Sequence, residues 1–212
     1  MIRAKRALLF APLIAVLACL QPALAAPQTL LQRMEDLNPH LHSYTASIHA
    51  DVQLHAFVSL SPTLDGTYYH KEPDKNKVVF TSGLPAIAAQ FGKVYPEIES
   101  PSRWDRVYRV STLGNDGTYT RLRLVPRKHG RIGRIDVTVN DATATIAYMR
   151  WIYNDGGYAE LHQTYSKIDG NLLVTGQSGS VETPQYSAQM RSTYSNFNLN
   201  AYIPDKVFEP NS

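Results

Sequence analysis

The sequence has few of the residues and motifs from which catalytic centres are built. Its 212 residues include a single cysteine, Cys19, which lies in an apolar stretch near the N-terminus. Neither Thr81-Ser82-Gly83 nor Ser178-Gly179-Ser180 has the G-x-S-x-G flanks of a nucleophile elbow, and no glycine-rich phosphate loop is present. Most candidate carboxylates fall in turn signals, where aspartate bonds to nearby backbone. These gaps disfavour an enzyme.

Metal-ligand patterns are equally sparse among the seven histidines. His40 and His42 form a pair without cysteine or acidic neighbours at ligand spacing. His49 and His55 share the polar side of one predicted strand, and a separation of roughly 20 Å is too large for one ion. We therefore expect no metal and no other cofactor. A cleft that brought His, Asp and Ser together would restore the enzyme hypothesis.

Residues 1–25 have the pattern of an export signal. A basic segment precedes an apolar stretch, Ala7–Leu20, which is short for a membrane span, and Ala23-Leu24-Ala25 supplies a cleavage site. We expect export to a bacterial periplasm, with Cys19 removed together with the signal. A competing interpretation treats Val16-Leu17-Ala18-Cys19 as a lipoprotein signal, in which Cys19 is acylated and anchors the chain.

Charge gives no sign of a nucleic-acid partner. Residues 1–25 hold three of the 21 basic residues and no acidic residue, so 18 basic and 18 acidic residues remain in the rest of the chain. No run of Lys and Arg suggests contact with phosphates.

The stretch from Ser43 to Leu60 predicts one long β-strand. Its even-numbered residues are apolar and its odd-numbered residues are mostly polar, with Phe57 as the exception. A period of two places one face in water and the other on an apolar interior. Because strands usually have about five or six residues, this length indicates a large, curved sheet.

The pattern of residues 26–212 predicts a single, mainly β domain with about ten or eleven antiparallel strands. Turn signals rich in Gly, Asn and Asp recur along it, as in an up-and-down meander. Such a sheet should curl into an incomplete barrel. With Asp65-Gly66 as a turn, the later strands are expected at 67–70, 77–81, 104–113, 118–127, 131–139, 144–153, 158–168, 171–175 and 185–199.

Two segments have helical patterns and could either pack on the sheet or cover a cavity. Gln28–Leu41 carries apolar residues at near-helical spacing, and Leu84–Phe91 is permissive for a helix. The lid residues that these segments predict are Leu30, Leu31, Met34, Leu37, Leu84, Ile87 and Phe91.

The inward-facing residues of a curled sheet either fill its core or line a ligand cavity. A pocket for acyl chains needs little more than apolar walls and a movable cover. The candidate lining residues are Ile48, Val52, Leu54, Val58, Tyr68, Phe80, Leu122, Leu124, Ile135, Val137, Trp151 and Tyr165.

This order of elements resembles the LolA family of outer-membrane lipoprotein-sorting proteins. The resemblance spans residues 28–210 and implies an incomplete antiparallel β-barrel with a helical lid over a hydrophobic cavity. It rests on the element order and on two motifs, Gly66, Tyr68, Lys71 and Pro73 in the second strand and Pro204-Asp205-x-Val207-Phe208 near the C-terminus.

The resemblance implies a periplasmic carrier that shields acyl chains from water without covalent chemistry, in lipoprotein sorting or lipid transport. The implied partners are an acylated lipoprotein or a lipid, together with a receptor protein of the inner or outer membrane. Two departures from the carrier are visible: Glu72 stands where the carrier has a basic residue, and Leu84–Pro101 replaces an aspartate–glycine–aromatic hairpin. An alternative is a protein-interaction or sensor module of the same fold in envelope-stress signalling.

Overall fold

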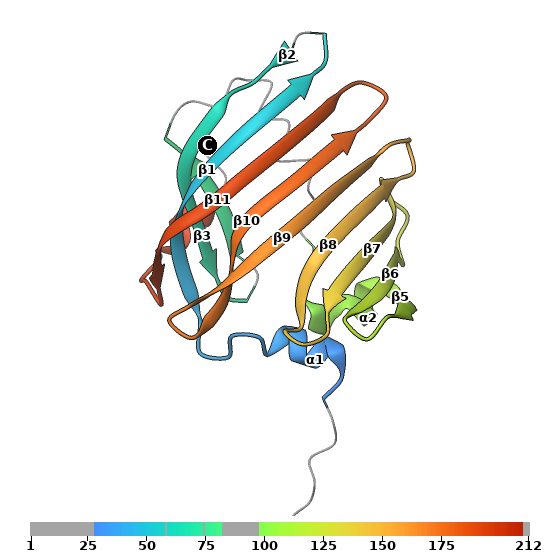
Figure 1. Ribbon diagram of the computed structural model, residues 1–212, viewed down its shortest axis with the longest axis horizontal. Helices are drawn as coiled ribbons and strands as arrows, with labels where there is room; N and C mark the ends of the chain where they lie inside the picture. Colours follow the sequence, from blue (N-terminus) through green and yellow to red (C-terminus); the bar gives the residue numbers. More distant parts are fainter. Residues whose placement is uncertain (1–27, 58, 74, 82–97, 210–212) are drawn as a thin grey trace, which may run out of the picture.

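An eleven-stranded antiparallel sheet forms most of the protein (Figure 1). The computed structural model describes residues 28–57, 59–73, 75–81 and 98–209. The strands are β1 (Ser43–His55), β2 (Ser59–Leu60), β3 (Thr63–Lys71), β4 (Lys75–Phe80), β5 (Tyr108–Asn115), β6 (Tyr119–Pro126), β7 (Ile132–Asn140), β8 (Thr145–Tyr153), β9 (Tyr158–Ile168), β10 (Asn171–Glu182) and β11 (Ser187–Leu199).

The helical elements are short. They are α1 (Leu30–Glu35), η2 (Pro101–Arg103), α2 (Trp104–Val107) and η3 (Asp205–Phe208). Figure 1 shows α1 and α2 together at one end of the curved sheet. In the described part of the chain, no helix has the length and apolar character needed to cross a membrane.

The strand order confirms an open barrel but differs from a simple meander. The order is β4-β3-β1-β11-β10-β9-β8-β7-β6-β5, with β2 paired to β1. Strands β5 to β11 follow one another as predicted, whereas β1 lies between β3 and β11. Pairing the first long strand with the last satisfies the backbone of β1 on both sides. Within the described residues, the edge strands β4 and β5 do not pair.

The predicted strand from Ser43 to Leu60 is wrong in its last part. Strand β1 ends at His55, the chain reverses, and β2 pairs back onto it with Leu60 opposite Leu54. The reversal falls where Phe57 interrupts the alternation, and this side chain is fully exposed. Asp65-Gly66, expected as a turn, instead lies inside β3.

The helical predictions also need correction. The predicted helix Gln28–Leu41 is reduced to α1, and the segment after Asp36 is held by side-chain bonds rather than by helical ones. The second predicted segment, Leu84–Phe91, lies outside the described residues.

Two strand predictions have the wrong bounds. Trp104–Val107 is helical and not the start of a strand, because a helical turn lets the Trp104 side chain enter the core, where its exposure is 0%. Strand β10 continues to Glu182 and not only to Thr175, because β9 and β11 supply hydrogen-bonding partners on both sides of its glycine- and serine-rich part.

The sheet has an apolar inner face, on which α1 and α2 pack, and a polar outer face. One inner row crosses six strands, and its residues are apolar apart from a glycine: Val52, Met190, Gly179, Leu161, Met149 and Val137. The next row on the outer face is polar throughout: Gln53, Gln189, Ser180, Glu160, Arg150 and Asp136. This alternation is the period of two that the sequence predicts.

The packed core lies under α1 and α2, on the inner face of β5 to β10. Trp104 and Met34 enter it from the two helices, and both are buried against the strands. Trp151, near the end of β8, is buried in this core with 2% exposure. The core therefore covers the inner face of one half of the sheet, and a cavity on this face has to lie beside the core.

Candidate functional site

The inner face holds a cavity between α1 and the ends of β1, β3, β9 and β10. Its volume is about 290 Å³, and it adjoins a second cavity of about 370 Å³. Pockets for small ligands are commonly about 300–1,000 Å³, so the first cavity falls just below that range and the second lies at its lower end. The two share His70, Pro73, Ser100 and Pro101, and the apolar wall of the first is formed by Met34, Leu37, Leu41, Leu172, Leu173 and Val174.

Helix α1 covers this cavity and is held mainly by tertiary contacts. Thr29 and Gln32 form a capping box at its N-terminus. A helix of six residues is marginal by itself, so its contacts with the sheet decide its position. Arg33 Nη1 donates to the Asp141 carbonyl at 2.8 Å, and Glu35 accepts from the Ser102 hydroxyl at 3.0 Å.

The segment after α1 is attached to β10 through one side chain. Asn38 donates to the Leu172 carbonyl at 2.9 Å and accepts from the Leu172 amide at 2.8 Å. This pair of bonds continues the hydrogen-bonding pattern of the strand edge. The cover and the apolar wall of the cavity are therefore joined at one point.

Two tyrosines, Tyr44 and Tyr165, line the same cavity, and Tyr68 packs beside Tyr44. The Tyr44 ring lies 5.7 Å from that of Tyr68 and 5.0 Å from that of His70. Burial raises the pKa of Tyr44 to about 12, while its hydrogen bond with Tyr68 acts in the opposite direction. The Tyr68 hydroxyl donates to Asn76 at 2.6 Å. The site thus combines apolar walls with phenol groups that can bond to a polar headgroup.

Three solved structures share this architecture. A DUF1329 family protein from Desulfovibrio piger is 16% identical with a TM-score of 0.62, over 85% of this chain and 94% of that one. A putative outer membrane lipoprotein-sorting protein domain from Vibrio parahaemolyticus is 13% identical with a TM-score of 0.60, over 84% and 94%. A LolA superfamily protein from Nitrosomonas europaea is 12% identical with a TM-score of 0.57, over 85% and 96%.

The fold is LolA-like. This confirms the resemblance at the level of architecture, and identities this low carry no residue roles. No protein-family model and no curated protein sequence matched the chain.

The eleven predicted lining residues that the structure describes all lie on the inner face of this LolA-like sheet. Only Tyr165 among them lines the cavity under α1. Five others belong to the packed core: Leu122, Leu124, Ile135, Val137 and Trp151. Val58 lies outside the described residues. A direct role of the remaining residues in ligand binding stays a prediction.

The predicted lid residues divide in the same way. Met34 and Leu37 line the cavity, whereas Leu30 and Leu31 pack against the core. The other three, Leu84, Ile87 and Phe91, lie outside the described residues.

Sequence reasoning missed most of the cavity wall. Leu172, Leu173 and Val174 open β10, and three consecutive apolar residues in a strand signal that both faces are covered. Tyr44 belongs to the alternating apolar pattern of β1 and is its first aromatic residue. These two signals could have located the cavity.

The two motifs that carry the LolA resemblance contact each other in space. Lys71 Nζ, in the second-strand motif, donates to Asp205 Oδ1 at 2.8 Å and to the Ile203 carbonyl at 3.1 Å. Glu72, which replaces a basic residue of the carrier, pairs instead with His42 at 2.8 Å. The Glu72 carboxylate therefore has a hydrogen-bonding partner, His42, within the structure.

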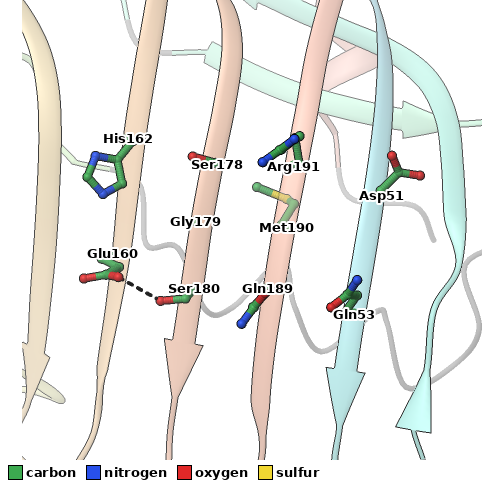
Figure 2. A pocket seen from close by; sticks show the side chains of 10 residues that line it. All are labelled: Asp51, Gln53, Glu160, His162, Ser178, Gly179, Ser180, Gln189, Met190 and Arg191. Carbon is green, nitrogen blue, oxygen red and sulfur yellow. Dashed lines mark hydrogen bonds between the residues drawn. The ribbon is translucent and has the colours of Figure 1, made fainter.

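A polar groove on the outer face has His, Asp and Ser among its lining residues, but it does not bring them together. Figure 2 shows this groove, about 530 Å³ in volume, with His162, Ser178 and Asp51 among its lining residues. His162 forms no hydrogen bond with Ser178, and Asp51 lies three strands away, at roughly 14 Å. A nucleophile must bond to its base for acyl transfer, so the groove contains no assembled triad. Among the described residues, no three metal-ligating side chains are grouped.

Proposed function

We propose that the protein is a carrier of the bacterial envelope that shields an acyl chain of a lipid or lipoprotein in the inner-face cavity. The observation that carries this proposal is the cavity under α1, with its apolar wall on β10 and α1 as its cover. The N-terminal pattern of residues 1–25 supports export to the periplasm. The LolA-like fold supports the same class of function.

The energetics favour an apolar ligand. Each methylene moved from water into such a site contributes about 0.8 kcal/mol. The tyrosine hydroxyls beside the wall can bond to an ester or amide at the end of the chain. Binding and release then need only a change in the contacts of α1, without covalent chemistry.

The test is the identification of bound ligand. The protein is isolated from the periplasm and analysed by native mass spectrometry, and binding of a fluorescent fatty acid is then titrated. We expect a co-purifying lipid or acylated peptide and saturable binding of the probe. The variant Leu37→Asp, which places a charge on the cavity wall, should weaken probe binding at least tenfold.

Leu113→Asp is the matched control, because this leucine is exposed on β5, away from the cavity lining. It should bind the probe like the parent protein. If no lipid co-purifies and the probe does not bind, the carrier proposal fails. A protein partner recognised without lipid would then favour the sensor alternative.

A further inference from the structure

The outer-face groove is built by the contrast between short and long side chains. Strand β10 contributes Ser178 and Ser180 as a low floor, and Figure 2 shows longer side chains on the neighbouring strands. Glu160 and His162 of β9 lie on one side of this floor. Gln189 and Arg191 of β11 lie on the other, followed by Gln53 and Asp51 of β1. The groove therefore crosses four strands, roughly 14 Å, and is about 7 Å long in the strand direction.

Several hydrogen-bonding groups in the groove have no partner among the described residues. Arg191 and Gln189 form no hydrogen bond with other side chains, and neither do Gln53 and Ser178. A guanidinium, two amides and a hydroxyl together offer many donors and several acceptors. A ligand that satisfies them must carry both kinds of group at close spacing.

The acidic residues of the groove are already positioned by hydroxyl groups. Glu160 accepts from the Tyr148 hydroxyl and from the Ser180 hydroxyl, both at 3.0 Å. Asp51 accepts from the Thr63 hydroxyl at 2.8 Å. These two carboxylates outnumber the single guanidinium of the groove, that of Arg191. This balance disfavours an anionic ligand.

Two other classes of ligand also fit poorly. An acyl chain would desolvate the groove without satisfying its polar groups. An extended peptide is usually recognised by adding a strand at a sheet edge, and β10 is an interior strand with both neighbours in place. A sugar presents hydroxyls that donate and accept on every side, and it needs no backbone partner.

We propose that this groove binds a short stretch of a neutral glycan, a disaccharide or trisaccharide, through its hydroxyl groups. Arg191, Gln189 and Gln53 bond the sugar from one wall, and Ser178 bonds it from the floor. This site lies on the opposite face of the sheet from the acyl-chain cavity and does not depend on it.

The test is a screen of the full chain against neutral oligosaccharides. Maltotriose, cellotriose, chitotriose and mannotriose are examined by saturation-transfer NMR, and any binder is titrated by calorimetry. We expect at least one to bind. Arg191→Gln removes the main donor and Ser178→Leu fills the floor, and each should weaken binding at least tenfold while leaving fluorescent fatty acid binding unchanged.

Arg121→Gln is the matched control, because Arg121 lies on the same outer face in β6, five strands from β11. It should bind the sugar like the parent protein, and circular dichroism should show all variants folded. The proposal is overturned if none of the four sugars binds at high concentration, or if both groove variants bind as tightly as the parent. Tighter binding of an acidic trisaccharide would overturn it as well.

Discussion

At the residue scale, Gly66 allows β3 and β4 to approach closely. A Cβ atom at this position would lie 2.5 Å from the Val79 carbonyl oxygen and 3.0 Å from the Phe80 Cα. Both neighbours are backbone atoms that cannot move without shifting β4. Gly66→Ala should therefore lower the free energy of unfolding by about 1–3 kcal/mol, the usual cost of overpacking. Urea titration followed by circular dichroism measures this change.

Gly130→Ala is the control for that substitution, because nothing lies within 4 Å of its added methyl group. It should leave the unfolding midpoint nearly unchanged. Equal midpoints for the two variants would show that strand β4 adapts freely, contrary to the expected contact.

His49 is a second residue whose behaviour follows from its neighbours. The hydrogen bond that His49 Nδ1 donates to Asp65 Oδ1, at 2.7 Å, raises the pKa of His49 above its ordinary value of 6.5, with partial desolvation acting against it. A raised pKa in the folded state stabilises the protein below pH 6.5, and this contribution is lost as the pH rises through the folded-state value. Asp65→Asn should bring the pKa back toward 6.5 in an NMR titration of the imidazole protons.

Asp105→Asn, in α2, is the comparison for this titration and should leave the pKa of His49 as it is. If Asp65→Asn also left it unchanged, the bond between His49 and Asp65 would not be present in solution.

At the element scale, local patterns predicted the strands well and their ends poorly. The alternation in β1 identified its inner face correctly, but the same pattern continues through Leu60, so it hid the reversal near Phe57. The prediction ends β10 at Thr175, and Gly176 and Gly179 beyond it have low strand propensity. Their place between two long strands decides their conformation, and no local pattern contains that information.

The C-terminal element η3 is attached to the sheet by charge. Hydrogen bonds from Lys71 and Lys75 lower the pKa of Asp205 to about 2. Because the folded-state pKa is lowered, the attachment is fully present above the ordinary value of 3.8 and is lost only as the pH falls through about 2. Asp205→Asn should therefore increase hydrogen exchange in residues 203–209 at neutral pH, as measured by mass spectrometry.

Lys206→Gln tests whether any charge change in η3 has the same effect, since Lys206 makes no ion pair with a described residue. Exchange in this variant should match the parent protein. Similar exchange in both variants would mean that burial of Ile203, and not the pair with Lys71, holds the segment.

At the scale of the whole molecule, the sequence predicted the class of fold and the inner face on which the cavity under α1 lies. It did not predict where on that face the cavity opens. The predicted lining residues Leu122, Leu124 and Trp151 fill the core instead, because Trp104 enters from a helix that the pattern did not predict. The outer groove has no signature in the sequence, because its floor residues, Ser178 and Ser180, are individually ordinary surface residues.

Trp104 is accordingly the residue on which the closed half of the sheet most depends. Its ring has 0% exposure, and its Nε1 donates to the Glu99 carbonyl at 2.6 Å. Truncating a buried tryptophan to alanine typically costs about 3–5 kcal/mol. Trp104→Ala should lower the free energy of unfolding by that amount in urea titrations, while Tyr202→Ala, at a 91% exposed position, should change it little. Equal stabilities would mean that the core of β5 to β10 closes without this side chain, and the division of the inner face into a packed half and a cavity would lose its physical basis.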